Sequence, residues 1–524
     1  MKFREIFYSL FVAAIVVAFA SCSKMPKSVS MLHEHPVLVG RIDVKQLADK
    51  GELSKEKSAI EDRLSGLSKE AREKIKEILD DPVQLGLDLR DPLFFSLDKR
   101  GDLRVVGTVY DDDDFKSFLE AVSKDAGFKV GEKDGFTYVD MGGGSLAFDG
   151  DCFLLSQEEG SPKKIFESNS NLAEDKDFIE MCDRDGDVQL LLYGNSLAEA
   201  MDAPKEAADR MENVSLLYEL AFNEGEVVQT LEALFKDDDA RKRFENYTAM
   251  AGDIKGEYAP YFSKNGFVIF GNVDGGKLYE VLDKLGAVQM AALQMDIPES
   301  EFASLIKSFD GDFGFGVNEL GAFGTGNGGL YLSMSSDKLL QKIVEAAGGE
   351  LRPAGVNQYV SADDDLNVTL GYKNNAVYAT FKRDSVMGAS YLTPFENAKN
   401  ALSKSDVQGK GSGLYAFLNF RMFDAMPQAE GVFKDFDYAE AYYDKSIKGV
   451  LRIVLKDKKK NSLVPFVKLL YNMAPKSSPA LDYEDYELDE MENDDYFTDD
   501  EVAADLWADD EEAAKAEELE ELLN

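Results

Sequence analysis

The chain has 524 residues, of which 44% are hydrophobic, and a formal net charge of -41 at pH 7. This length and apolar content predict two or more domain-sized folded units. The strong negative charge repels phosphate backbones, which argues against nucleic acid as a partner. It also argues against adsorption to an anionic bilayer without a further anchor.

The first 21 residues have the pattern of a secretory signal peptide. Lys2 and Arg4 form a short positive region, and an apolar run of 15 residues follows over 6–20. That run is shorter than the about 20 residues that a membrane-spanning helix needs. Two small residues then precede Cys22, as in the lipobox of bacterial lipoproteins. We therefore expect residues 1–21 to be removed and Cys22 to carry the lipid that anchors the protein.

Several acyl chains on one residue give stable membrane anchoring. Residues 22–35 are polar at their start and are interpreted as a tether between the lipid and the folded body. Ser23 follows the cysteine, which favours the outer membrane over the inner, with its periplasmic face favoured over the cell surface. A plain signal peptide before a chance cysteine, or an uncleaved anchor, remains the alternative.

Recurring patterns predict that the body is internally repeated. An apolar strand, a polar turn and a helix start occur in this order from Pro36, Gly186, Gly266 and Ser412. Each copy combines alternating or continuous apolar residues with a helix-start signal.

A larger pattern recurs from Asp102 and from Gly329: a strand, a capped amphipathic helix, a glycine turn and hairpins. A truncated third copy is a further possibility from Gly449. We therefore predict an α+β fold of two repeat units, residues 36–261 and 262–475. Each unit is expected to be an antiparallel sheet with helices packed on one face.

A helical connector is predicted over residues 204–252, near the end of the first repeat unit. Its apolar residues recur at spacings that suit one face of a helix. They include Leu216, Leu217, Leu220, Leu231 and Phe235.

Residues 476–524 are predicted to form an acidic tail. The last 43 residues hold 21 acidic residues against one lysine, which predicts disorder or a solvated helix. Trp507, the only tryptophan, lies near Val502 and Leu506, and this apolar island is a candidate docking site for a partner. A solubilising tail with incidental apolar residues is the alternative.

The chain resembles an uncharacterised family of bacterial envelope lipoproteins, typical of gut anaerobes and known as a domain of unknown function. The resemblance is carried by Cys22 with its lipobox, by VGRIDVKQLADKG at 39–51 and by LGLDLRDPLFFSLD at 85–98. It covers residues 36–475 and implies an α+β extracytoplasmic protein without an assigned activity.

The two histidines of the chain, His33 and His35, both lie beside the predicted tether. They share a face of an extended segment, but two ligands do not complete a zinc site. A Ser-His-Asp arrangement would have to use one of them, which makes such a triad implausible. We expect no metal site and no cofactor.

Serine–lysine pairs at SxxK spacing are candidates for histidine-independent hydrolysis. The KTG and SDN partners of such enzymes are absent, so chance matches explain the pairs better. The pairs are Ser54 and Lys57, Ser161 and Lys164, and Ser304 and Lys307.

Glycines 324, 326 and 329 have GxGxxG spacing, but a strand follows where a phosphate cradle needs a helix. We predict a glycine-rich hairpin turn here, and likewise at residues 142–144.

Acidic runs invite comparison with calcium loops, without matching one. Asp111 to Asp114 precede a predicted helix, whose free N–H groups they would cap. Asp183, Asp185 and Asp187 alternate around a glycine at the wrong loop position, and residues 363–365 lie in a predicted turn. Dedicated calcium sites are not expected.

Cys152 lies in a predicted strand and Cys182 near a predicted helix end. Two buried, unpaired thiols are predicted, and a disulfide between them is the alternative in an oxidising envelope.

Together these features predict an envelope lipoprotein with a non-enzymatic binding or scaffolding role. Its partner would be the membrane, through lipid on Cys22, and an envelope protein or a glycan. A hydrolase using carboxylates or a Ser/Lys pair is one alternative. A carrier of an apolar ligand is another, and it would need a large apolar cavity.

Overall fold

The computed structural model describes most of the chain between residues 25 and 473. Two compact units are distinguished, residues 1–473 and 474–524, and every described residue belongs to the first. The described residues are 25–51, 69, 72–74, 76, 85–88, 90–158, 161–168, 170–203, 205–294, 297–321, 325–361, 367–383, 392–408, 413–426, 429, 431–443 and 447–473.

Among these residues, twenty strands form one sheet. The first ten are β1 (Leu38–Ile42), β2 (Leu93–Leu97), β3 (Leu103–Thr108), β4 (Val130–Lys133), β5 (Phe136–Asp140), β6 (Ser145–Phe148), β7 (Cys152–Ser156), β8 (Val188–Tyr193), β9 (Val214–Asn223) and β10 (Glu226–Phe235). The other ten are β11 (Phe267–Asp274), β12 (Phe309–Leu320), β13 (Gly326–Met334), β14 (Leu351–Gly355), β15 (Gln358–Ser361), β16 (Asn367–Lys373), β17 (Ala376–Arg383), β18 (Leu414–Asn419), β19 (Phe436–Tyr443) and β20 (Lys448–Leu455).

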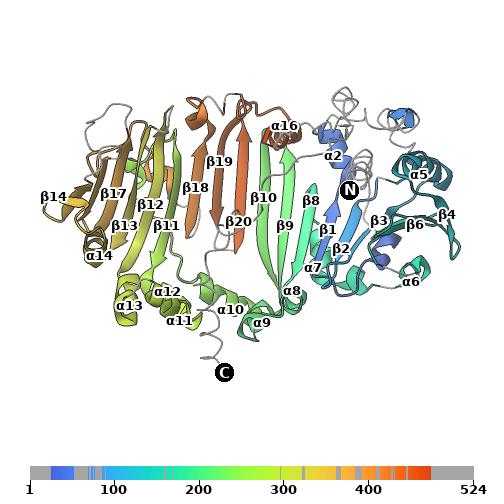
Figure 1. Cartoon of the computed structure of the whole chain (residues 1–524), viewed down its shortest axis with the longest axis horizontal. Helices are drawn as coiled ribbons and strands as arrows, with labels where there is room; N and C mark the ends of the chain where they lie inside the picture. The colour runs from blue at the N-terminus through green and yellow to red at the C-terminus, as the bar shows by residue number, and fades with distance from the viewer. Residues whose placement is uncertain are drawn as a thin grey trace, which may run out of the picture. The chain divides into compact units, whose positions relative to one another are not determined.

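The described helices follow strands or connect them, and Figure 1 shows α11 to α13 at one end of the strands and α2 and α16 at the other. They are η1 (Lys27–Met31), α2 (Val44–Gly51), α5 (Asp112–Ala126), α6 (Pro162–Phe166), η5 (Asn171–Glu174), α7 (Lys176–Cys182), α8 (Gly194–Ala200), α9 (Lys205–Met211), α10 (Asp238–Thr248), η6 (Ala259–Tyr261), α11 (Gly275–Lys284), α12 (Ala287–Gln294), α13 (Glu299–Lys307), α14 (Lys338–Ala346), α15 (Lys404–Val407), η8 (Phe420–Phe423) and α16 (Leu463–Met473).

All strand pairings are antiparallel. The first ten strands pair in the order β4-β5-β6-β7-β3-β2-β1-β8-β9-β10. The other ten pair in the order β14-β15-β16-β17-β13-β12-β11-β18-β19-β20. The two series meet where β10 pairs with β20, which lie side by side in Figure 1. The fold is therefore α+β, as predicted, with one large antiparallel sheet.

The predicted helical connector over residues 204–252 is wrong in its central part. Only α9 and α10 are helical there, and between them β9 and β10 form a long hairpin. The two-residue turn is Glu224-Gly225, with Gly225 at φ 78°, a left-handed conformation that glycine adopts without strain. Leu216, Leu217 and Leu220 recur at a spacing that also suits a helix, and this similarity caused the error.

The prediction of helices on one face is wrong at β7, whose five residues are all buried. Phe153 and Leu155 pack with α5 in one core cluster. Cys152 and Leu154 pack with η1 and α7 in another. Because successive strand residues point to opposite faces, helical segments cover both faces of the sheet here.

The folded body begins earlier than the predicted tether allows. Residues 25–35 are described, and Val29, Met31 and Leu32 are 1–2% exposed in the same cluster as Phe178. Burial of three large apolar side chains favours packing over extension into solvent. The prediction that 22–35 is a tether is therefore wrong over 25–35.

The second series of strands carries a core rich in aromatic rings. Phe262 packs edge-on against Phe270 and Tyr331, with ring centroids 5.4 and 5.8 Å apart. Gly316 of β12 makes room for this, because a Cβ there would lie 2.8 Å from the Phe262 ring. The rings of Tyr331 and Tyr378 stack at 6.5 Å.

One buried ion pair fixes α2 to the sheet. The Lys50 ammonium donates to both Asp187 carboxylate oxygens at 2.7 Å, and the Phe222 N–H donates to Asp187 at 2.6 Å. The Asp187 side chain is 0% exposed. Burial raises the pKa of the Asp187 carboxyl, against the opposing effects of Lys50 and the Phe222 N–H.

Replacing Lys50→Met should lower the free energy of unfolding by about 3 kcal/mol, because it leaves a buried carboxylate without its cation. Urea denaturation of the Cys22→Ala chain measures this. Lys163→Met is the matched control: its partner Glu167 lies 3.8 Å away and both side chains are more than half exposed. That control should cost less than about 1 kcal/mol. Equal small losses in both variants would show that Asp187 is not dependent on Lys50.

Candidate functional site

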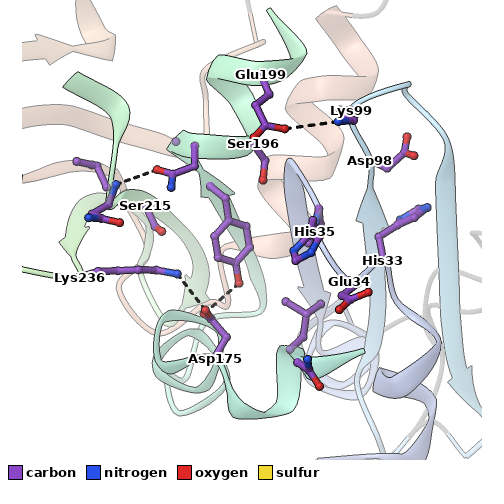
Figure 2. Close-up of a pocket in the computed structure, with 18 residues that line it drawn as sticks. His33, Glu34, His35, Asp98, Lys99, Asp175, Ser196, Glu199, Ser215 and Lys236 are labelled. Carbon is purple, nitrogen blue, oxygen red and sulfur yellow. Dashed lines mark hydrogen bonds and ion pairs between the residues drawn. The ribbon is translucent and has the colours of Figure 1, made fainter. Parts of the chain in front are cut away.

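A cleft with a volume of about 690 Å³ opens where several strand ends meet (Figure 2). Its lining comes from the segment before β1, the β2–β3 turn, the end of β8 and the start of β9. In an antiparallel sheet these strand ends lie at the same edge, so segments distant in sequence converge. The volume lies within the range of small-molecule sites.

Asp175 organises one wall of the cleft. Its carboxylate caps α7 by accepting from the Phe178 N–H at 3.0 Å. It also accepts from the Tyr193 hydroxyl at 3.2 Å and from Lys236 at 3.1 Å. Burial, and then Asp175, raises the pKa of the Tyr193 phenol, which therefore stays protonated and donates. The sequence analysis missed these three residues because they are far apart in the chain and form no motif.

Further contacts of the cleft join a lysine to a glutamate and two asparagines to each other. Lys99 lies 3.5 Å from Glu199, and both side chains are more than 60% exposed. The Asn195 side chain accepts from the Asn213 N–H at 2.8 Å. Asn171 and Ser196 also line the cleft. Amide and hydroxyl groups thus lie beside two lysines that are each paired with a carboxylate of the cleft.

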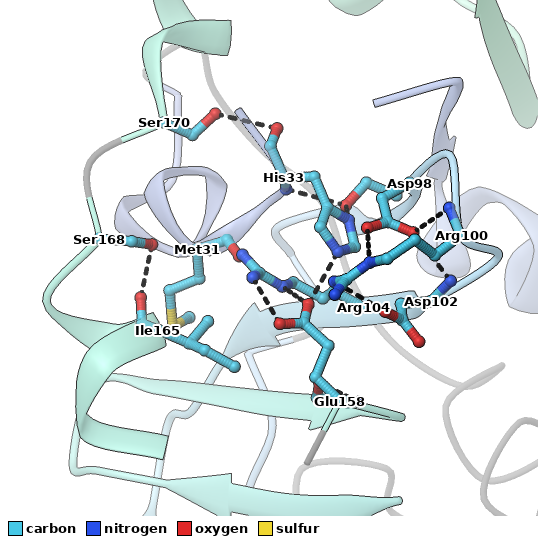
Figure 3. A network of polar contacts seen from close by, with 12 residues as sticks. Met31, His33, Asp98, Arg100, Asp102, Arg104, Glu158, Ile165, Ser168 and Ser170 are labelled. Atoms are coloured by element: carbon cyan, nitrogen blue, oxygen red, sulfur yellow. Dashed lines mark hydrogen bonds and ion pairs between the residues drawn. The ribbon is translucent and has the colours of Figure 1, made fainter. Parts of the chain in front are cut away.

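The two histidines both border the cleft, but their side chains have different surroundings. His35 and Glu34 are exposed and lie at the cleft, whereas the His33 ring points away from it (Figure 2). That ring is buried in a polar network with Ser96 and Glu158 (Figure 3). His33 therefore belongs to the folded body and not to the predicted tether over residues 22–35.

The His33 network has the distances of a catalytic relay. Nδ1 lies 2.8 Å from the Ser96 hydroxyl and Nε2 lies 2.8 Å from Glu158. However, Ser96 is 0% exposed, so no substrate reaches its hydroxyl. Arg104 holds both Glu158 oxygens, at 2.6 and 3.1 Å, and donates to the Met31 carbonyl at 3.0 Å. The network is a clamp that holds the start of the fold on the sheet.

A family model for a domain of unknown function, DUF4836, matches residues 30–463, which is most of the chain. The chain belongs to the DUF4836 family. This confirms the predicted membership of an uncharacterised family. No curated protein sequence matches this DUF4836 chain.

Three crystal structures of TP0453 are similar to part of this DUF4836 protein. Form IV is 13% identical, with a TM-score of 0.27, and the match covers 40% of this chain and 81% of that one. Form I is 16% identical, with a TM-score of 0.25 and coverages of 41% and 80%. Form III is 13% identical, with a TM-score of 0.25 and coverages of 43% and 87%.

The helices of the described part include none that is long and apolar enough to cross a membrane. Cys22 and the candidate docking residues Val502, Leu506 and Trp507 lie outside the described residues.

The structure separates the serine–lysine candidates. Ser161 bonds to Asp134 rather than to a lysine, and residues 54 and 57 lie outside the described part. Ser304 and Lys307 border an open cavity of about 870 Å³, where Ser304 accepts from Lys338 at 2.9 Å. Lys307 instead lies over the Tyr279 ring, with its ammonium 3.7 Å from the ring centroid. The structure therefore gives Ser304 a contact with Lys338 in place of the lysine of its own motif.

The glycine-rich segments are structural. Gly326 and Gly329 belong to β13, so the predicted turn is confined to the residues before Gly326, and Gly324 lies outside the described residues. Gly142, at φ 65°, lies in the predicted turn between β5 and β6.

The acidic runs also have structural partners. Asp111 caps α5 by accepting from the Asp114 N–H at 3.0 Å, as predicted. Asp183 is the C-cap residue of α7, and Asp187 pairs with Lys50. Residues 363–365 lie outside the described part. Among the residues described, no three His, Cys, Asp or Glu side chains are grouped to hold a metal ion.

The prediction of unpaired thiols is confirmed in the described part, and the prediction that both are buried holds only for Cys152, which lies in β7. Cys182, the last residue of α7, is half-buried. They lie in or against the same core cluster. Burial raises the pKa of each thiol to about 12.

Lowering the pH should destabilise the protein through His33. Burial, and then the Arg104 charge, lowers the His33 pKa below its ordinary 6.5. The unfolded chain therefore binds a proton at this site more readily, and the free energy of unfolding falls as pH falls from about 6.5 through the lower folded-state pKa. Melting temperatures between pH 7.5 and 5 measure the slope.

His33→Gln should flatten that slope, whereas His35→Gln, a matched change at an exposed ring two residues away, should leave it intact. Burial opposes the ionisation of Glu158, but Arg104 lowers the pKa of this carboxyl below its ordinary 4.5. Protonation of Glu158 therefore affects stability only at a pH below the range measured for His33. An unchanged slope in His33→Gln would assign the pH dependence to another group.

The two thiols should react slowly in the folded state. With pKa values of about 12, both are almost wholly protonated at pH 8, and the thiolate is the nucleophile. In the Cys22→Ala chain, iodoacetamide should modify Cys152 and Cys182 at least 100-fold more slowly than in urea, as followed by mass spectrometry. Rapid modification of either cysteine under native conditions would show that its thiol is accessible to reagent in the folded state.

Proposed function

We propose that the protein is a lipid-anchored protein of the bacterial cell envelope that binds a neutral, hydroxyl-rich glycan in the cleft without catalysing a reaction. One observation carries the proposal: both lysines of the cleft are paired with carboxylates that also line it. Lys236 pairs with Asp175, and Lys99 pairs with Glu199. An anionic ligand would have to displace one of these carboxylates.

A neutral polar ligand meets no such penalty. The amides of Asn171, Asn195 and Asn213 and the hydroxyl of Ser196 border the same space. Amides both donate and accept, and hydroxyls do the same, so they match the alternating donors and acceptors of sugar hydroxyls. The charged and amide side chains at this cleft support a polar ligand over the mainly apolar cavity that a carrier of an apolar ligand needs.

The contacts of the candidate catalytic groups support binding over hydrolysis. His33 is held in a buried clamp, and Ser304 accepts from Lys338, which lies outside its SxxK motif. A nucleophile needs a neighbouring base that can accept its proton. The carboxylates of the cleft stay candidates for hydrolysis of a glycan, and product analysis decides between the two.

The anchor and location are part of the proposal. The lipobox-like sequence supports lipid on Cys22, and Ser23 favours the outer membrane, with the periplasmic face preferred. The acidic tail with Val502, Leu506 and Trp507 is proposed as a second contact site, for an envelope protein.

We also propose that the body arose from two copies of one unit. Each pairing among β1–β10 has a counterpart in which both strand numbers are higher by ten, such as β1–β8 and β11–β18. Where the series meet, Thr230 pairs with Val450. These two residues hold corresponding positions in β10 and β20, as across a two-fold axis.

Glycan binding is tested by array screening of the Cys22→Ala chain, followed by calorimetric titration of the retained oligosaccharides. Ser196→Trp should weaken binding at least tenfold, or about 1.4 kcal/mol, because the ring fills the cleft. Ala200→Trp is the matched control, on the same helix and exposed but outside the lining.

Loss of binding in both tryptophan variants, or retention of no oligosaccharide by the unchanged chain, would overturn the glycan assignment. Release of shortened products during the titration would convert the binding proposal into the hydrolase alternative.

A further inference from the structure

We infer that the face of the body around η1 is held within roughly 11 Å of the membrane that receives the lipid on Cys22. This inference rests on the proposed lipidation. It adds to that proposal which face of the body points to the membrane and how far this face lies from it. Three peptide steps separate Cys22 from Met25, and an extended chain spans at most about 3.6 Å per step. Met25 is the first described residue and already packs against a core cluster.

The start of the fold is fixed on several sides. The Ser30 carbonyl accepts from the Ser170 N–H at 3.0 Å, and the Met31 carbonyl accepts from Arg104 at 3.0 Å. The His33 N–H donates to the Ser96 hydroxyl at 3.1 Å. Figure 3 shows the contacts of Met31 and His33, together with the Ser170 hydroxyl, which donates to the His33 carbonyl at 3.3 Å. Pulling this segment free would break these bonds and expose its apolar residues, so it does not serve as a longer tether.

The charges near η1 suit a membrane surface better than the chain as a whole does. Lys27 pairs with Asp151 at 2.7 Å, and both side chains are 68% exposed. On α6, which contacts η1, Lys163 pairs with Glu167, and Lys164 is exposed. Balanced charges with accessible lysines avoid the repulsion that a chain of net charge -41 otherwise meets at anionic headgroups.

This placement restricts what the protein can reach. A tether over residues 22–35 would allow thirteen steps, or roughly 47 Å, between the lipid and the body. Because the body begins at Met25, the maximum distance between the lipid and the body is about four-fold shorter. A partner of the body must therefore itself lie at or near the same membrane.

Energy transfer from the protein to headgroup-labelled lipid tests the distance. The full lipoprotein is reconstituted in phosphatidylethanolamine–phosphatidylglycerol vesicles that contain rhodamine-labelled lipid. A donor dye is attached at Lys27→Cys or, as a control, at Val356→Cys. Val356 is 94% exposed in the turn between β14 and β15, at the end of the second strand series. Cys152 is buried and Cys182 is half-buried, so both labelled chains also carry Cys182→Ser.

Transfer from position 27 should exceed transfer from position 356 at least twofold. Inserting twelve glycine and serine residues between Lys24 and Met25 adds a flexible reach of about 20 Å and should reduce transfer at position 27. Equal transfer at both positions, or no effect of the insertion, overturns the inference.

Metabolic labelling with an alkyne palmitate separates this failure from failure of the proposed anchor. A labelled chain with equal transfer at both positions retains the anchor and refutes the membrane-facing orientation. A chain that takes up no label, and that behaves like Cys22→Ala, refutes lipidation and the orientation together.

Discussion

The hydrogen-bonded pairing of β10 with β20 is the constraint on which the single sheet depends, because among the described strands it is the pairing that joins the two series. Arg452 of β20 reinforces it by contacting Glu226 of β10 and Glu440 of β19. More than 200 residues separate the paired strands. Such a contact forms only after a long loop closes, so it makes a large entropic demand on folding, and the local hairpins on either side precede it.

The same topology is filled differently in its two series. Val39 of β1 pairs with Ser96 of β2, and the His33 ring packs on Ser96. Val268 of β11 pairs with Gly316 of β12, and the Phe262 ring packs over Gly316. Each ring lies five residues before its strand begins. The equivalent positions of the two series therefore differ: His33 belongs to a polar clamp in the first series, and Phe262 belongs to an aromatic cluster in the second.

Much of the local structure could be predicted from the sequence, because strand and helix signals are local. The strand–helix pairs from Pro36 and Gly266, and the cap at Asp111, all appear where expected. The β9–β10 hairpin could not, since its leucine spacing also fits a helix. The cleft was also out of reach of sequence reasoning: Asp175, Tyr193 and Lys236 become neighbours only through strand pairings, which periodicity does not encode.

The difference between the two series bears on why the clamp exists. The second series shows that this fold can close the position with aromatic rings alone, and buried ion networks rarely exceed well-packed apolar groups in stability. Stability therefore does not explain His33, Arg104 and Glu158. The clamp fixes the path of the main chain. Arg104 binds the Met31 carbonyl and Ser96 binds the His33 N–H, and both points lie between the proposed anchor and the cleft. The segment that follows the proposed anchor is thereby held in place as it becomes one wall of the proposed binding cleft.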